Sequence, residues 1–521
     1  MLGTATASER TDFSARNLAK LAFITVCAFL VMGYHPGLED DSFYLAAIKR
    51  NLNPALFPHD AEFFRLQFQA TIFDKLIACS IRLSHLPVAW AALLWQFAAI
   101  FFLLHGCWRI SRRCFSKSEA HWAAVSLIGV LLTLPVSGIA IDLADQYLHP
   151  RTLATAAILA AIVAIMDRRL WLAGVLLAIA FAIHAIMACF GISFCAFLLW
   201  NRRASLPRQP SSIPAAAVLL APLGWIFEPA SDAWRQAAAT RSFYFLARWP
   251  WYEWLGVFAP LALVYLYWRL LQRGAELSND RSQRPALSSL VLSLLYFGIL
   301  QTVVGLLIML PPSLERLRPF EPMRYLHLFY LMFFLILGGL LGRFLLDRHL
   351  YRWLLLFLPL SAAMFYMQHQ LYPSSPHLEL PGVASDNAWL QAFAWIRQNT
   401  PVDSLFALGP HYVALPGEDY HGFRAIAERS VLADFDKDGG MAARVPRLAP
   451  RWLREVNAQT GWQTFQASDF QRLKKEFGVT WVILSRHDDL GSGVPGDVPG
   501  DGQDGMTCPY QNQQLRVCRL Y

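Results

Sequence analysis

The sequence predicts a mainly α-helical polytopic membrane protein that ends in a smaller α/β domain. Of its 521 residues, 55% are hydrophobic and only 16% are charged, whereas soluble globular chains contain about 25% charged residues. The hydrophobic residues are also gathered in long runs, and a helix needs about 17–25 mostly apolar residues to cross a bilayer. Collagen-like, disordered and small disulfide-bonded proteins are therefore excluded.

About eleven apolar runs predict membrane-spanning helices. The first run follows Arg10, Arg16 and Lys20 and has no small-residue cleavage site behind it, so we expect an uncleaved anchor. The runs at 170–184 and 186–200 are close enough to form one long helix instead. The predicted spans are 18–34, 87–106, 120–138, 152–166, 170–184, 186–200, 213–227, 252–272, 287–310, 325–346 and 350–367.

The charges between these runs predict an orientation. Short loops on the same side as the N-terminus contain basic clusters, such as those at 109–117 and 202–208, and the longer loops on the other side contain most of the acidic groups. Basic loops stay in the cytoplasm. The N-terminus is therefore expected inside a bacterial inner membrane, and the C-terminal residues in the periplasm. The positive excess behind the net charge of +8 lies between the spans, so no nucleic-acid partner is expected.

Residues 1–373 are predicted to form the transmembrane domain, and its outer loop at 35–86 is predicted to contain two interfacial helices. In the first helix, Tyr44, Ile48 and Leu52 recur at helical spacing, which is typical of an amphipathic helix on a membrane surface. The second helix is expected to begin near residue 61. A further span at 67–86 would place the basic residues of 109–117 outside, so 61–86 is predicted to be an interfacial or partly buried helix.

Residues 374–521 are predicted to form an outer α/β domain. Two of its cysteines, Cys508 and Cys518, either form a disulfide, which an oxidising compartment permits, or stay reduced.

The densest polar cluster of the first outer loop is Glu39-Asp40-Asp41. One interpretation is a helix start, where an Asp accepts backbone N–H bonds and the other acids favour the positive end of the helix dipole. The other interpretation is functional. Adjacent like charges raise the pKa of at least one carboxyl group, which suits a general base, and such a cluster also suits a divalent cation.

An acidic pair directly after the first span, followed by two interfacial helices, resembles the GT-C glycosyltransferases. The stretch 35–64 is also similar to bacterial membrane proteins of GT-C-like organisation, and the topology agrees over nearly the whole chain. The resemblance extends to an acidic motif at 142–151 and to a helix, Thr-Pro turn and strand at 395–408. The Trp-Trp-Asp motif of oligosaccharyltransferases is missing, so that branch is not expected.

The resemblance implies an enzyme that takes a sugar from a polyprenyl-phosphate carrier at the outer membrane face. Its general base would be Asp40 or Asp41, with Glu39 beside them. The expected partners are the polyprenyl-phosphate-linked sugar, the lipid bilayer, and a glycan or lipid acceptor. A divalent cation held by the three carboxylates stays open, since some GT-C branches use one and others do not.

Other polar residues of the outer loops are candidates for substrate binding. The motif at 142–151 forms either a polar wall of a cavity or a solvated loop. Outer arginines either hold a carrier phosphate through paired hydrogen bonds, belong to an aromatic belt, or pair with Glu315 and Glu321. The candidates are Asp142, Asp145, His149, Arg151, Arg241, Arg248, Arg316, Arg318, Arg324 and, in the outer domain, Arg424 and Arg429.

Two other function classes remain as alternatives. A transporter or flippase would place ionisable residues within its spans, whereas here they collect at the outer edge. A non-catalytic lipid-binding subunit of cell-envelope polysaccharide assembly would keep the same topology. The sequence contains no P-loop, dinucleotide fingerprint or CxxC pair, so ATP hydrolysis, redox chemistry and zinc are not indicated.

Overall fold

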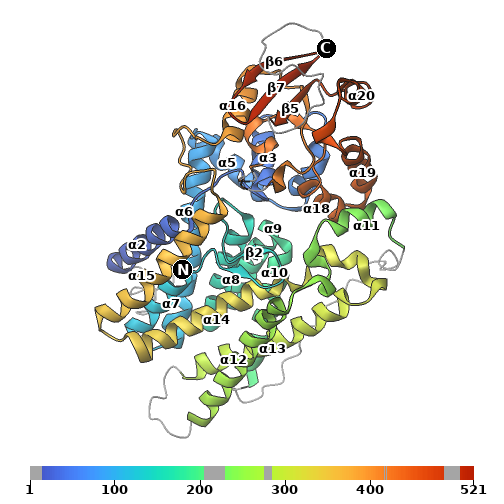
Figure 1. Ribbon diagram of the computed structural model, residues 1–521. Helices are drawn as coiled ribbons and strands as arrows, with labels where there is room; N and C mark the ends of the chain where they lie inside the picture. The colour runs from blue at the N-terminus through green and yellow to red at the C-terminus, as the bar shows by residue number, and fades with distance from the viewer. Residues whose placement is uncertain are drawn as a thin grey trace. The chain divides into compact units, whose positions relative to one another are not determined.

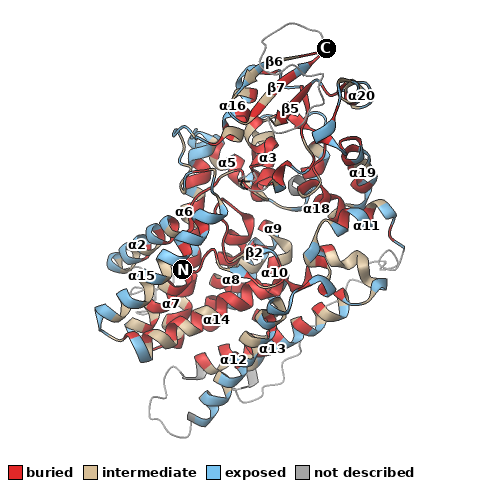
Figure 2. Cartoon of the chain, viewed as in Figure 1, coloured by how far each residue is buried: buried red, intermediate tan, exposed pale blue. Residues whose placement is uncertain are grey.

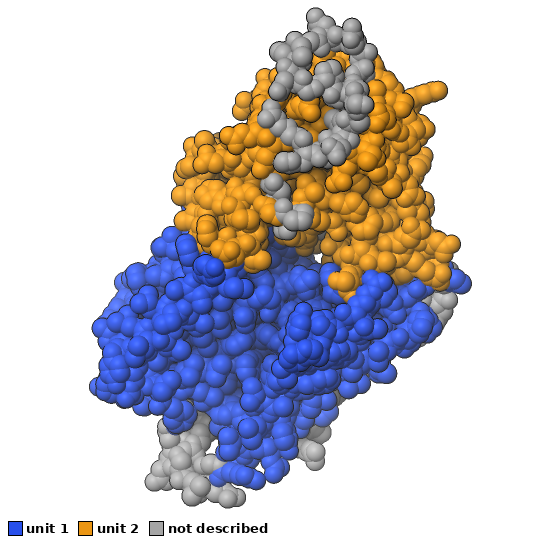
Figure 3. Space-filling model, viewed as in Figure 1, with its two compact units in different colours: residues 1–33, 94–229, 243–368 blue, residues 34–93, 230–242, 369–521 orange. Residues whose placement is uncertain are grey.

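The computed structural model describes residues 14–204, 229–274, 284–415, 417, 419, 421–485 and 505–521. The chain divides into two compact units (Figure 3). Unit 1 comprises Met1–Gly33, Leu94–Pro229 and Phe243–Gln368, and unit 2 comprises Tyr34–Leu93, Ala230–Ser242 and His369–Tyr521. The predicted boundary at residue 373 divides the chain into two consecutive segments. The contacts in the structure instead place the first outer loop in the same unit as the C-terminal residues.

Helices account for most of unit 1, and they coincide with the apolar runs of the sequence (Figure 1). Two of them, α6 and α15, extend across the division between the units. These helices are α2 (Ala15–Met32), α6 (Val88–Cys114), α7 (Ser118–Val130), α8 (Pro150–Met166), α9 (Leu170–Ile183), α10 (Ala185–Ala204), α12 (Trp251–Gly274), α13 (Arg284–Met309), α14 (Tyr325–Leu341) and α15 (Leu350–Leu371).

Seven of the described helices are long and apolar enough to cross a membrane, and α8 and α9 are shorter apolar helices. Much of the apolar surface of α12 and α15 is exposed (Figure 2), including Leu354, Leu355 and Leu358 of α15. A large exposed apolar surface marks contact with lipid or another protein. The predicted polytopic helical fold is confirmed.

The structure settles two details of the predicted spans. The run at 120–138 is helical only as far as Val130, because Pro135–Val136 (β1) pairs with Ile141–Asp142 (β2) in a short antiparallel ladder. The alternative of one helix over 170–200 is wrong, since the extended backbone of His184 separates α9 from α10. The predicted span at 213–227 lies outside the described residues.

Within unit 1, α14 and α7 approach each other through small residues. A Cβ atom at Gly338 would lie 2.7 Å from the Cα of Ala124. At Gly342, in the π-helical turn Gly342–Leu346 that follows α14, a Cβ would lie 2.5 Å from the carbonyl oxygen of Glu119. Glycines spaced four residues apart permit this backbone approach between membrane helices.

Unit 2 is built on a five-stranded sheet with the order β4-β3-β5-β7-β6. Its first three strands are parallel, and β7 and β6 continue the sheet in antiparallel pairing. The predicted α/β domain is therefore confirmed. The strands are β3 (Leu405–Ala407), β4 (Ser430–Val431), β5 (Trp481–Ser485), β6 (Met506–Gln511) and β7 (Leu515–Leu520), and the helices beside them are α16 (Ala388–Asn399), α19 (Ala449–Ala458) and α20 (Ala467–Phe477).

Both faces of this sheet are buried. Phe406 and Ile483 belong to one apolar core, while their neighbours Leu405 and Val482 belong to a second core. The two cores follow the alternation of side chains along a strand, and burial on both faces is typical of parallel strands.

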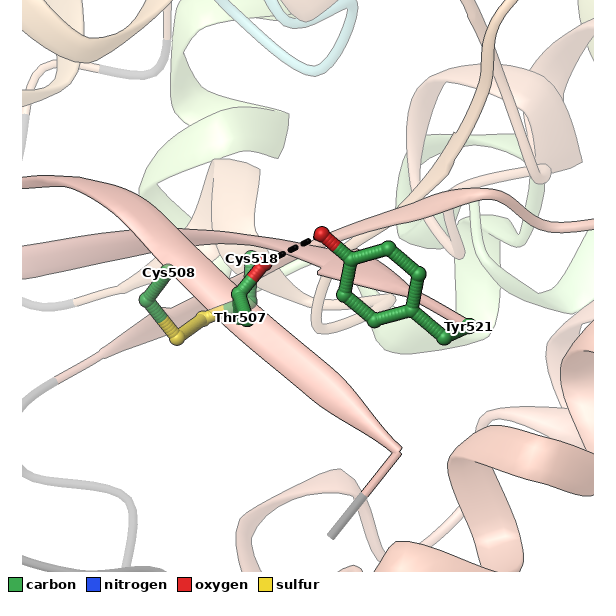
Figure 4. Close-up of a disulfide and its surroundings, with 4 residues drawn as sticks. All are labelled: Thr507, Cys508, Cys518 and Tyr521. Atoms are coloured by element: carbon green, nitrogen blue, oxygen red, sulfur yellow. Dashed lines mark hydrogen bonds between the residues drawn. A yellow bond between two sulfur atoms is a disulfide. The ribbon is translucent and has the colours of Figure 1, made fainter. Parts of the chain in front are cut away.

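At the far edge of the sheet, a disulfide joins Cys508 of β6 to Cys518 of β7 (Figure 4). Beside it, the hydroxyl groups of Thr507 and Tyr521 lie 2.8 Å apart. Of the two alternatives for Cys508 and Cys518, the structure contains the disulfide.

The first outer loop and several short helices complete unit 2. The first predicted helix of this loop is present as α3 (Asp41–Leu52). It is not an amphipathic surface helix as predicted, because every residue of Asp41–Ile48 is buried (Figure 2). Phe57, Phe64 and Met441 pack with α3 in one apolar cluster. The elements are α3 (Asp41–Leu52), α4 (Arg65–Ala70), α5 (Phe73–Ser84), α11 (Asp232–Ala239), α17 (Phe423–Ala427) and α18 (Lys437–Arg444).

The α7–α14 contact makes a steric prediction. Gly342→Leu should destabilise the purified protein by about 1–3 kcal/mol, because its side chain would overlap backbone atoms of α7. The measurement is the thermal unfolding midpoint, with Gly174→Leu in α9 as the control, since nothing lies within 4 Å of a Cβ there. Equal midpoints for the two variants would contradict the close packing.

Candidate functional site

The three acidic residues of the first outer loop point in different directions at the start of α3. Asp41 is buried, and its carboxylate accepts a hydrogen bond from the backbone N–H of Gly37 at 2.7 Å. Asp40 precedes the helix but makes no capping hydrogen bond with its side chain. The side chains of Glu39 and Asp40 are 42% and 33% exposed. Asp41 therefore closes the turn, while the other two carboxylates remain accessible.

The ammonium group of Lys437 lies between the two accessible carboxylates. It forms an ion pair with Glu39, and its Nζ atom is 3.4 Å from Oδ1 of Asp40. Lys437 is the first residue of α18 and is buried. Burial alone would lower the pKa of Lys437, but the charges of Glu39 and Asp40 outweigh it and raise the pKa. Lys437 is thus kept positively charged in this cluster.

A second ionic contact fixes the position of Lys437. The buried Arg424 donates two hydrogen bonds of 2.9 Å to Asp438, the residue after Lys437, and its Nε donates to Asp60 of the first outer loop. Its guanidinium also lies over the ring of Phe63. Burial lowers the pKa of Arg424, but Asp438 and Asp60 together raise it well above its usual range. All three guanidinium nitrogens are engaged, so we interpret Arg424 as a positioning residue.

The start of α18 holds a further buried carboxyl group. Asp434 accepts hydrogen bonds from the backbone N–H groups of Lys437 and Asp438. Burial and the neighbouring charge of Asp438 raise the pKa of Asp434 to about 8. The sequence showed the charge alternation of this segment but not which of its residues are buried together.

Two other predicted arginines of unit 2 differ in their surroundings. Arg241 follows α11, and its guanidinium packs so closely on Gly440 of α18 that a Cβ there would lie 2.3 Å from an Nη atom. No carboxylate among the described residues pairs with Arg241. Arg429, in contrast, donates to the carbonyl oxygens of Arg397 and Thr400 at the end of α16. Arg241 is therefore available to an anion, whereas Arg429 stabilises a helix end.

The predicted acidic motif of unit 1 is gathered at the start of α8. Arg151 forms a buried ion pair with Asp145, and the Nδ1 atom of His149 accepts the backbone N–H of Arg151 at 3.0 Å. The Nδ1 atom of His149 also lies 3.7 Å from Oδ2 of Asp145. Asp145 is therefore buried in an ion pair, which contradicts the alternative of a solvated loop. Asp142 is half-buried in β2.

The predicted outer-loop arginines of unit 1 have mixed partners. Arg324 pairs with the buried Glu321, and Arg316 donates to the carbonyl oxygen of Pro229. The guanidinium groups of Arg248 and Arg318 both lie over the ring of Phe245, at 4.5 and 5.2 Å from its centroid. Internal pairing, the alternative to phosphate binding, is present at Arg324.

The three carboxylates of the first loop do not fit a divalent cation. Among the described residues, no three His, Cys, Asp or Glu side chains gather at a spacing suited to a metal ion. Asp41 turns toward Gly37, and the ammonium of Lys437 lies where a cation shared by Glu39 and Asp40 would be expected.

Sequence reasoning missed a buried cluster beside the first loop. The carboxylate of Glu379 lies 2.8 Å from Nδ1 of His35 and 3.0 Å from Nε2 of His421. Gly422, next to His421, donates its N–H to the carbonyl oxygen of Gly37. Burial raises the pKa of Glu379, but the two imidazoles outweigh it and lower the pKa. The available signal was His35 directly after an apolar span.

Comparisons with known proteins give the following matches. Residues 387–444 match a family described as a domain of unknown function, DUF6798. No curated protein matches the chain. The archaeal oligosaccharyltransferase AglB from Archaeoglobus fulgidus, in complex with an inhibitory peptide and a dolichol-phosphate, has a TM-score of 0.42 and 12% identity over 90% of this chain and 69% of that chain. The A. fulgidus oligosaccharyltransferase in the apo form has a TM-score of 0.42 and 13% identity over the same shares.

The Glu379 cluster makes a prediction about pH. Because the pKa of Glu379 is lower in the folded protein than its ordinary 4.5, its ionised form stabilises the fold above that pH, and this stabilisation disappears as the pH falls through the lowered pKa. Glu379→Gln should therefore cost about 1–3 kcal/mol at pH 7 and progressively less in acid.

Thermal unfolding of the two proteins from pH 7 down to about pH 3, beyond the ordinary range of a carboxyl group, measures this difference. Glu476→Gln, at an exposed position of α20, is the control. A gap between wild type and Glu379→Gln that stays constant over this range would contradict the assigned ion pairs.

Proposed function

We propose that the protein is a membrane glycosyltransferase that moves a sugar from a polyprenyl-phosphate-linked donor to a glycan or lipid acceptor. The main support is the cluster of Glu39, Asp40 and Lys437, in which two accessible carboxylates follow the first membrane helix and are held by one buried ammonium. The GT-C resemblance of the sequence predicts catalytic carboxylates at this position in the chain.

Asp40 is the favoured general base. Asp41 already accepts the N–H of Gly37 and is buried, so it is less suited to accept a substrate proton. Glu39 forms the closer pair with Lys437, whereas the contact of Asp40 with the same ammonium is 3.4 Å long. Lys437 would position both carboxylates before the acceptor binds.

The reaction would proceed by direct displacement. Asp40 takes the proton from the acceptor hydroxyl group as its oxygen forms a bond to the anomeric carbon. The bond from that carbon to the carrier phosphate breaks on the opposite side, and the electron pair leaves with the polyprenyl phosphate. The sugar is transferred with inversion, and the donor itself supplies the driving force, so ATP is not needed.

Cations would hold the carrier phosphate. In unit 2, we propose this role for Arg241, which packs on Gly440 and has no carboxylate partner among the described residues. Within unit 1, Arg248 and Arg318, which share the ring of Phe245, are proposed as a separate pair of phosphate-binding candidates. Arginine suits this role because its planar guanidinium donates two parallel hydrogen bonds to phosphate.

We also propose that the protein lies in a bacterial inner membrane with the sheet of unit 2 in the periplasm. The disulfide between Cys508 and Cys518 supports this placement, because disulfides persist in oxidising compartments and are rare in the cytosol.

The base assignment predicts a specific loss of product. Asp40→Asn should reduce transfer about 10²–10⁴-fold, the usual contribution of a general base, while the protein still folds, because the amide keeps the shape of the carboxylate. The measurement is mass spectrometry of glycans and glycolipids from cells lacking the chain, complemented with wild type or variant at equal expression.

Asp386→Asn, at an exposed position of unit 2, is the matched control and should restore the product fully. A hexose- or pentose-sized mass that is lost on deletion, and restored by wild type and control only, supports the proposal. Full restoration by Asp40→Asn would exclude Asp40 as the base. It would instead favour a transporter or a non-catalytic subunit, whereas no change on deletion under conditions that express the chain would contradict the proposed function class.

A further inference from the structure

A cavity of about 450 Å³ lies within unit 2, apart from the first outer loop. Gly409, Pro410 and His411 on its wall lie within four residues after β3, Phe435 lies four residues after β4, and Ser485 is the last residue of β5. These three strands are parallel, so their carboxyl ends meet at one edge of the sheet. Ligands of α/β domains bind at this edge, and the volume lies within the range of small-molecule sites.

Aromatic rings form much of the cavity wall. Trp389 of α16 stacks on Tyr412 with 5.8 Å between the ring centroids and 29° between the planes. Trp462 packs on Gly409, where a Cβ would lie 3.2 Å from the indole ring. The ring centroids of Phe435 and His411 lie 4.5 Å apart. Aromatic side chains from several segments therefore contribute apolar surface to the wall.

The exposed rim of the cavity is polar and uncharged. Asn457 and Gln463 lie on it, and within the described part of the chain their side-chain amides make no hydrogen bond. The hydroxyl groups of Thr460 and Thr464 donate to backbone carbonyl oxygens, which leaves their oxygen lone pairs free to accept. Among the described residues that line the cavity there is no Asp, Glu, Lys or Arg.

This lining discriminates among classes of ligand. Within the described lining, an anion such as a nucleotide or sugar phosphate would find no Lys or Arg side chain, and an organic cation would find no carboxylate. A purely apolar ligand would cover the amides of Asn457 and Gln463 and leave them without hydrogen bonds, which costs free energy. A neutral sugar has C–H faces that pack on aromatic rings and hydroxyl groups that both donate and accept, as amides require.

We propose that this cavity binds a neutral carbohydrate, with the sugar ring packed between Trp389 and Trp462 and its hydroxyl groups bonded to Asn457 and Gln463. The site is separate from Glu39 and Asp40, so the inference does not depend on the proposed transfer reaction. It adds a sugar-binding site to the α/β part of the chain.

The test is saturation-transfer NMR on the full-length protein in lipid nanodiscs, so that no detergent sugar competes. The probes are the trisaccharides of glucose, galactose, mannose and N-acetylglucosamine, with adenosine and glucose 6-phosphate for comparison. At least one neutral trisaccharide should show transfer to its C–H protons and bind more tightly than adenosine and glucose 6-phosphate.

A double variant, Asn457→Ala with Gln463→Ala, should weaken binding at least tenfold with an unchanged unfolding midpoint, because both side chains are exposed. Gln398→Ala on α16, outside the cavity, is the control and should bind as wild type. Asp40→Asn should also bind as wild type, which separates this site from the proposed catalytic one.

Several outcomes would overturn the proposal. These are no transfer to any neutral trisaccharide, tighter binding of adenosine or glucose 6-phosphate, or unchanged binding by the double variant.

Discussion

One buried guanidinium joins the first outer loop to the α18 segment within unit 2. Arg424 pairs at once with Asp60 of that loop and with Asp438 of α18. Removing a charge from water costs several kcal/mol unless partners satisfy it, so the three residues are stable only together. Through this contact, segments more than 360 residues apart in the sequence become one structural unit.

The same contact determines the geometry of the proposed site. Asp438 and Lys437 are adjacent, so holding one places the other against Glu39 and Asp40. The close packing of Arg241 on Gly440 brings a second cation to the same short helix. The acidic residues of the first loop thus belong to an ordered cluster of charged groups. The carbohydrate cavity uses a different edge of unit 2, where the parallel sheet ends.

The membrane helices and the α16–β3 segment were predictable because hydrophobic runs and turn residues act locally. The burial of α3 was not predictable, since the spacing of Tyr44, Ile48 and Leu52 reports one apolar face, while the other faces are covered by distant parts of the chain. Arg424 and Arg429 resembled available cations for a similar reason. Their carboxylate and carbonyl partners lie far away in sequence, and no local pattern reveals them.

The most direct test of this account is a double-mutant cycle on Asp60 and Arg424 in the purified full-length protein. Thermal unfolding would be measured for Asp60→Asn, Arg424→Met and the double variant. Each single substitution should lower the free energy of unfolding. The double variant should lose about 1–3 kcal/mol less stability than the sum of the two single losses, which is the coupling energy of the pair. Strictly additive losses would show that the two residues act independently, and the first loop would then need another anchor.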